Sequence, residues 1–115
     1  MSNANRLVQG TLDMLILRTL VFGPAHGHAV AKHIQRTSDE VLQVETGSLY
    51  PALRRLEQDG LIEANWAKSK ERNRELRFYS LTAKGRNHLR AESSKWKELF
   101  DGVARVMWPA EESEA

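Results

Sequence analysis

The feature that most constrains the fold of this chain is a change of hydrophobic period at Gly60. Before Gly60, apolar residues recur every three or four positions, which is typical of amphipathic helices. After Gly60, apolar and polar residues alternate over 61–66 and 76–81, which predicts the two strands of a hairpin. A helical pattern resumes at Ala83 and continues to about Met107. We therefore expect a mainly α-helical fold with a small β-hairpin and a long last helix.

Three helices are predicted ahead of the hairpin, over 10–22, over 27–36 and from about residue 46 to Asp59. Thr46, Gly47 or Ser48 could cap the third helix, and Gly60 is expected to end it. The first helix carries two apolar stripes; one is Leu12, Leu15, Ile16 and Leu20, and the other is Met14, Leu17 and Val21. We expect one stripe to face the chain's own core and the other to meet a further helix or a second subunit.

Length and composition limit the possible classes of protein. A chain of 115 residues has room for one domain, and it has no cysteine and no apolar run near the roughly 18 residues of a membrane span. The beginning of the sequence does not resemble a signal peptide, so we expect a cytoplasmic protein. Residues 1–90 carry 14 Lys or Arg against 9 Asp or Glu, net +5, whereas 91–115 carry 3 against 6, net −3. A basic body of this kind can attract a polyanion.

The third predicted helix separates into an apolar and a polar face. Leu49, Ala52, Leu53 and Leu56 share one side, while the opposite side carries Gly47, Pro51, Arg54 and Gln58, flanked by Ser48, Tyr50 and Arg55. Guanidinium, phenol and hydroxyl groups near a helix N-terminus are able to contact base edges and phosphates in a DNA major groove. The pattern therefore favours a recognition helix, although an ordinary amphipathic helix with a solvated polar face has the same pattern.

The connection between the two predicted strands, residues 67–75, is rich in basic side chains. Lys68, Lys70, Arg72 and Arg74 alternate along it. A cationic hairpin that follows a recognition-type helix is typical of a winged helix, in which the tip contacts the DNA backbone. Because Glu71 and Glu75 lie among the cations, a solubilising loop of mixed charge is the alternative. We expect phosphate contact, and not base reading, from this tip.

Four segments, GTLDMLILRTL, HGHAVAKHI, GSLYPALRRLEQDGLIE and FYSLTAKGR, closely resemble the PadR family of transcriptional regulators. The resemblance spans most of residues 7–107. It implies a winged helix-turn-helix regulator that binds an inverted-repeat operator in double-stranded DNA and represses transcription until a small-molecule inducer or another signal releases it. The predicted DNA-binding residues are Thr46, Gly47, Ser48, Tyr50, Pro51, Arg54, Arg55, Lys68, Lys70, Arg72 and Arg74.

The resemblance also implies a homodimer held together by the first and last helices. A heptad-like stripe in the last helix, with Leu89, Trp96 and Val103 seven residues apart, is in keeping with that role. The predicted interface comprises Leu12, Met14, Leu17, Val21, Leu89, Trp96, Leu99, Phe100, Val103 and Val106. Trp96 is also a candidate for a ligand pocket, with plain packing as the favoured alternative. The expected division is a DNA-binding domain over 1–82, a dimerisation helix over 83–108 and an acidic tail over 109–115.

No enzyme class and no metal site is indicated. The sequence has no glycine-rich phosphate loop and no nucleophile with a placed base, so we expect neither a cofactor nor catalysis. His26, His28 and His33 cluster at the second helix but lack a carboxylate or thiol at ligand spacing. His28 departs from the resembled family, which commonly has tyrosine there. A winged-helix module that binds an acidic protein instead of DNA remains the alternative, and it should expose apolar groups on the third helix.

Overall fold

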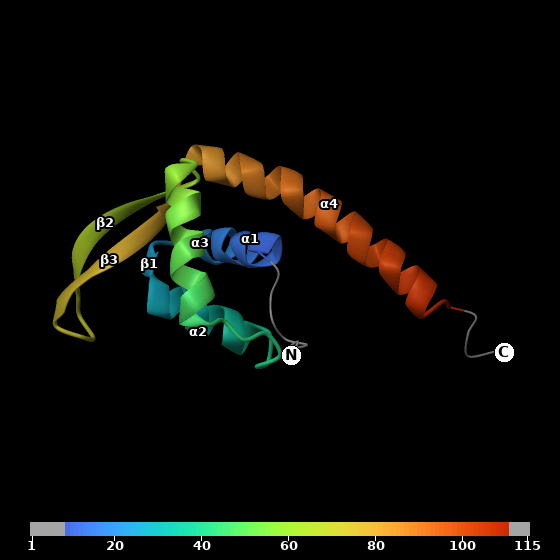
Figure 1. Cartoon of the computed structure of the whole chain (residues 1–115), viewed down its shortest axis with the longest axis horizontal. Helices are drawn as coiled ribbons and strands as arrows, with labels where there is room; N and C mark the ends of the chain where they lie inside the picture. The colour runs from blue at the N-terminus through green and yellow to red at the C-terminus, as the bar shows by residue number, and fades with distance from the viewer. Residues whose placement is uncertain (1–8, 111–115) are drawn as a thin grey trace.

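The computed structural model describes residues 9–110, which form four helices and one small sheet (Figure 1). The elements in chain order are α1 (Gln9–Leu20), β1 (Ala25–His26), α2 (Gly27–Thr37), α3 (Thr46–Gln58), β2 (Ile62–Ser69), β3 (Arg74–Leu81) and α4 (Ala83–Met107). The first three helices and the sheet make a body from which α4 extends to one side (Figure 1). The predicted class, a winged helix-turn-helix with a C-terminal helix, is confirmed. Residues 111–115 of the predicted acidic tail lie outside the described residues.

The sheet has three antiparallel strands in the order β1-β3-β2, one more than predicted. The added strand, β1, pairs Ala25 with Tyr79 and is only two residues long, too short to produce a period in the sequence. The hairpin strands are also longer than predicted, because β2 continues to Ser69 and β3 begins at Arg74, directly opposite it. The predicted nine-residue loop is therefore a turn over 70–73. Polar residues on both faces had concealed the ends of the two strands.

Helix α1 lies at the centre of the core and packs against α2, α3, α4 and β3. Its Ile16 side chain is fully buried, and the two predicted stripes do not stay apart, because Leu12 and Leu17 enter the same core. The expected core faces of the other helices are confirmed: buried residues include Val30 and Ile34 of α2 and Leu49, Ala52, Leu53 and Leu56 of α3. Burial of a side chain the size of Ile16 stabilises the fold by about 1.5–3 kcal/mol.

The start of α3 differs from the prediction, whereas its end does not. Glu45 is the capping residue, and none of Thr46, Gly47 and Ser48 caps, because all three are already helical. The Glu45 carbonyl accepts hydrogen bonds from the Ser48 and Leu49 N–H groups, and its side chain makes no capping bond. At the other end, Gly60 adopts a φ of +76°, the left-handed conformation that ends a helix.

The first turn of α4 is attached to the chain between α3 and β2. Thr82 caps α4 as predicted, its Oγ1 accepting from Gly85 N–H at 2.9 Å, and the same hydroxyl donates to the Gly60 carbonyl at 2.7 Å. Lys84 Nζ donates to the Asp59 carbonyl at 2.9 Å. The position of the long helix is therefore set by residues 59–61, directly after α3. No helix within residues 9–110 is long and apolar enough to cross a membrane.

Candidate nucleic-acid interface

The outward face of α3 carries the polar groups that the sequence placed there. Its buried residues all lie on the opposite face, and six predicted DNA-binding residues are exposed: Thr46, Gly47, Ser48, Tyr50, Pro51 and Arg54. We call this set the exposed face of α3. Since the Glu45 side chain makes no capping bond and the Ser48 N–H donates to the Glu45 carbonyl, the N–H groups of Thr46 and Gly47 are the ones left for an external acceptor. The face combines hydrogen-bond donors, one guanidinium and the positive end of a helix dipole.

Arg55 differs from the other predicted residues because an acidic partner within the chain holds it. Its Nη2 lies 2.9 Å from Asp13 Oδ1 of α1, and both side chains are largely covered. Burial raises the pKa of Asp13, although the hydrogen bond and charge of Arg55 act to lower it. The pair joins α3 to α1 and turns the Arg55 guanidinium away from the exposed face of α3.

A second ion pair, which the sequence did not reveal, joins α3 to the sheet. Arg77 Nη2 of β3 lies 2.8 Å and 3.0 Å from the two carboxylate oxygens of Glu57. Hydrogen bonding to Glu57 raises the pKa of Arg77. The two residues are twenty positions apart in different elements, so no local sequence pattern relates them. With the Arg55–Asp13 pair, this contact fixes α3 relative to both α1 and the hairpin.

Tyr50 and Gly27 bring the exposed face of α3 against the start of α2. A Cβ atom added at Gly27 would lie 2.9 Å from both Cε1 and Oη of Tyr50, closer than such contacts normally allow. Glycine at this position therefore lets the Tyr50 ring rest on the α2 backbone. The sequence had marked Gly27 only as a helix start, because a close approach between two helices leaves no periodic signal.

The four basic residues of the hairpin are exposed, but only two of them lie in the turn. Lys70 and Arg72 belong to the turn, whereas Lys68 and Arg74 lie in the strands, with Lys68 paired opposite Glu75. The turn is held by buried Ser69, whose Oγ accepts from Arg72 N–H at 3.2 Å, and by Asn73 at a φ of +53°. We call β2, the turn over 70–73 and β3 together the wing. Its four cations are presented by a defined turn and by the strand ends on either side of it.

A small concavity of about 270 Å³, the cationic pocket, lies between the start of α2, α3 and the wing. It is lined by His26, Gly27, His28, Tyr50, Arg72, Arg74, Leu76, Arg77 and Tyr79. His26 Nδ1 accepts the Ala29 N–H at 3.3 Å and so caps α2. Burial, and then the charges of Arg72 and His28, lower the pKa of His26. Within the described residues, no three His, Cys, Asp or Glu side chains gather into a metal site.

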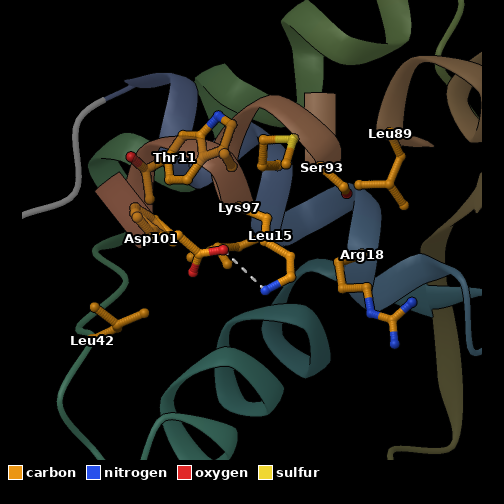
Figure 2. A pocket seen from close by; sticks show the side chains of 11 residues that line it. Thr11, Leu15, Arg18, Leu42, Leu89, Ser93, Lys97 and Asp101 are labelled. Carbon is orange, nitrogen blue, oxygen red and sulfur yellow. Dashed lines mark hydrogen bonds and ion pairs between the residues drawn. The ribbon is translucent and has the colours of Figure 1, made fainter. Parts of the chain in front are cut away.

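A larger apolar groove of about 550 Å³ runs between α1 and α4 (Figure 2). Its lining residues are Thr11, Met14, Leu15, Arg18, Leu42, Leu89, Ser93, Trp96, Lys97, Phe100 and Asp101. Trp96 meets Phe100 edge to face, with ring centroids 5.2 Å apart. Lys97 and Asp101 form an ion pair of 3.3 Å at the groove, drawn as a dashed line in Figure 2. Trp96, the candidate ligand residue, is thus part of an apolar concavity.

The residues predicted at a dimer interface fall into two groups. Leu12, Leu17 and Leu89 are buried within the core of the single chain, and Met14, Val21 and Trp96 are partly buried. Leu99, Phe100, Val103 and Val106 are exposed on α4. Met107 at the end of α4 and Trp108 directly after it are exposed too, and neither was among the predicted interface residues. The outer half of α4 therefore presents a run of large apolar side chains.

Comparison with known proteins agrees with this architecture. The model of the transcriptional regulator PadR-like family matches residues 16–91. The 37.1 kDa protein in transposon TN4556 of Streptomyces fradiae is 34% identical over 101 residues, which are 88% of this chain but only 27% of that protein. The crystal structure of a PadR family transcriptional regulator from Eggerthella lenta is 34% identical, with a TM-score of 0.70 over 87% of this chain and 84% of the other. A PadR-like transcription factor from Bacteroides fragilis is 31% identical, with a TM-score of 0.69 over 85% and 91%.

Proposed function

Since the chain belongs to the PadR-like family of transcriptional regulators, we propose that it represses transcription by binding an inverted-repeat operator as a homodimer. A small molecule or another signal releases it from the DNA, and it acts in the cytoplasm. The observation that carries this proposal is the exposed face of α3 beside the basic wing. The two surfaces belong to one packed unit, because α3 contacts α1 and β2 in a shared core and ion pairs also join it to α1 and β3.

In the proposed complex, the exposed face of α3 enters the major groove. Arg54 is the side chain best suited to read a base, since a guanidinium can donate two hydrogen bonds to guanine. Ser48 and Tyr50 lie nearer the helix N-terminus, where N–H groups can bind a phosphate. Arg55 holds α3 in place through Asp13 and is a positioning residue.

The wing contributes contacts to the sugar–phosphate backbone. Lys68, Lys70, Arg72 and Arg74 are all exposed, and such contacts add affinity without reading sequence. Their contribution is sensitive to salt because each neutralised phosphate releases a counterion.

The exposed apolar run of α4 is the proposed dimer surface. Val106 is 80% exposed and Leu99 60% exposed, although both are large apolar side chains on a well-formed helix. Coverage by α4 of a second copy would remove this area from water. Symmetry of the dimer then presents two copies of α3, which is the reason for proposing an inverted repeat.

The groove between α1 and α4 is the proposed site of the releasing signal. Apolar walls with an aromatic pair, Trp96 and Phe100, suit a planar apolar compound. Because α4 is joined to the end of α3 through residues 59–61, a shift of α4 would be passed to the recognition helix. The protein-binding alternative is less well supported, since the exposed face of α3 is polar and basic where a protein-binding version should be apolar.

The proposal is tested by selecting binders from a random duplex library and titrating the selected duplex by fluorescence anisotropy. Selection should yield an inverted repeat with half-sites about one helical turn apart. Arg54→Ala should lose about 1–3 kcal/mol on that duplex and little on random DNA. Replacing Arg72 and Arg74 with alanine should weaken binding to both duplexes equally. Arg105→Ala, in the last turn of α4, is the control for lost charge. Equal effects of all variants on all sequences would refute the role of α3.

A further inference from the structure

The cationic pocket has the composition of an anion site. Its lining includes the guanidiniums of Arg72, Arg74 and Arg77, two imidazoles and two phenols, and it includes no carboxylate. Arg77 is already paired with Glu57, which leaves Arg72 and Arg74 as its unneutralised guanidiniums. Three elements that are distant in the sequence, the start of α2, α3 and the wing, converge on it. A pocket of this kind attracts an anion the size of a phosphate.

The position of the pocket indicates which anion it would hold. Tyr50 is shared by the pocket and by the exposed face of α3, so a group bound in the pocket lies directly beside the recognition helix. Gly27 begins α2 there, and the positive end of the α2 dipole adds to the field. In a duplex whose major groove receives α3, the neighbouring group is a phosphodiester of the DNA backbone.

We infer that the cationic pocket binds one backbone phosphate of the operator and that His28 takes up a proton as this phosphate enters, so that DNA binding strengthens as pH falls. The inference rests on the proposed function, because the phosphate is supplied by bound DNA. Proton balance is simple: one proton moves from solvent to the imidazole, and no bond in the DNA changes.

The two imidazoles have different roles in this inference. His26 uses Nδ1 to accept the Ala29 N–H, so its neutral ring carries the proton on Nε2 and donates from there. The ring of His28 lies parallel to that of His26, with centroids 6.3 Å apart, and its side chain is exposed and makes no such cap. His28 is therefore the ring that can gain a proton without breaking the start of α2.

The charged groups around the pair favour proton uptake only when the phosphate is present. Arg72 faces the two imidazoles from the turn, Arg74 and Arg77 face them from β3, and the phenols of Tyr50 and Tyr79 face them from α3 and β3. Glu71 of the turn lies outside the lining, and its charge acts weakly on His26 in the opposite sense to that of Arg72. The guanidiniums of Arg72 and Arg74 make the field in the pocket positive in the free protein. Burial is the main cause of the lowered pKa of His26, and the charge of Arg72 lowers it further. A phosphate between the guanidiniums and the imidazoles reverses the sign of that field and stabilises an imidazolium.

The test measures the affinity for the selected duplex at pH 6 and pH 8, by anisotropy at several salt concentrations. Uptake of one proton can change affinity by at most about tenfold per pH unit, so we expect wild-type affinity to rise roughly five- to tenfold from pH 8 to pH 6. The salt slope should steepen by about one phosphate contact at pH 6. His28→Gln should remove most of both changes, and His28→Arg should bind at pH 8 as the wild type does at pH 6.

His88→Gln, which removes an exposed histidine of α4, is the matched control and should keep the full pH dependence. Circular dichroism at both pH values checks that every variant is folded. If His28→Gln keeps the wild-type pH dependence, or if the wild type has none, the inference is wrong while the proposed function stands. If no duplex binds at either pH, the proposed function itself fails.

Discussion

Gly85 lies where α4 crosses the base of the hairpin, and its replacement by alanine should be strongly destabilising. An added Cβ would overlap the carbonyl oxygen of Leu61 and would lie 2.8 Å from Leu81 Cδ1. The oxygen belongs to the backbone, so the helix itself must move. Overpacking of this kind costs about 3 kcal/mol, and movement of the first turn weakens the cap from Thr82 by about 1 kcal/mol. Alanine returns about 1 kcal/mol through helix propensity, which leaves a net loss of about 3 kcal/mol.

Urea denaturation followed by circular dichroism measures this loss, which corresponds to a fall in melting temperature of roughly 15 °C for a domain of this size. The control is Gly102→Ala in the same helix, where the nearest atom to an added Cβ is Arg105 Nη2 at 3.8 Å. That change should stabilise the chain by about 0.5–1 kcal/mol. Two protein concentrations separate folding from association. A free energy of unfolding for Gly85→Ala within about 0.5 kcal/mol of the wild type would refute the close approach of α4 and Leu61.

Three further predictions concern the Arg55–Asp13 ion pair, the His26 cap of α2 and the exposed apolar run of α4. Arg55→Met should lower the free energy of unfolding by about 1–2 kcal/mol, because it leaves the half-buried carboxylate of Asp13 unpaired. Asp13→Asn should cost less than about 0.5 kcal/mol. Equal losses for the two variants in urea denaturation would contradict burial as the main cause of the raised pKa of Asp13. The pKa of His26 is lowered from 6.5, so the stability given by its neutral, capping ring is present above pH 6.5 and lost as pH falls through the lowered pKa. His26→Asn, which caps α2 without titrating, should therefore show a smaller fall in melting temperature from pH 7.5 to pH 5 than the wild type. An equal fall in the two proteins would exclude protonation of His26 as the cause of the loss of stability at low pH. Val106→Asp should give a monomer in light scattering, whereas Arg105→Asp, next to Val106 but off the apolar run of α4, should keep the dimer. If both variants stay dimeric, the interface lies elsewhere.

The sequence predicted best those parts of the fold in which several apolar residues repeat at the spacing of a helix. Leu49, Ala52, Leu53 and Leu56 repeat at helical spacing and are all buried on one side of α3. Gly60 and Thr82 carry local chemistry, a left-handed conformation and a side-chain cap, and both act as predicted. Such signals depend only on neighbouring residues, so the sequence contains them directly.

The contacts that sequence could not provide join residues far apart. Arg55 looks like a DNA-binding side chain on a helical wheel, and only the fold shows that Asp13, 42 positions earlier, pairs with it. Glu57 and Arg77, and Gly27 and Tyr50, are further pairs that form when separate elements pack. The cationic pocket has the same origin, because it combines the start of α2 with α3 and the wing.

The central claim, that the exposed face of α3 reads DNA sequence, is tested most directly by the discrimination of the wild-type protein itself. Anisotropy titrations at about 0.15 M salt compare the selected inverted repeat with a shuffled duplex of equal length and composition. We expect at least about a thousandfold tighter binding to the repeat, with both affinities falling as salt rises. Equal affinity for the two duplexes would mean that the basic surface attracts DNA without reading it, and would contradict the account.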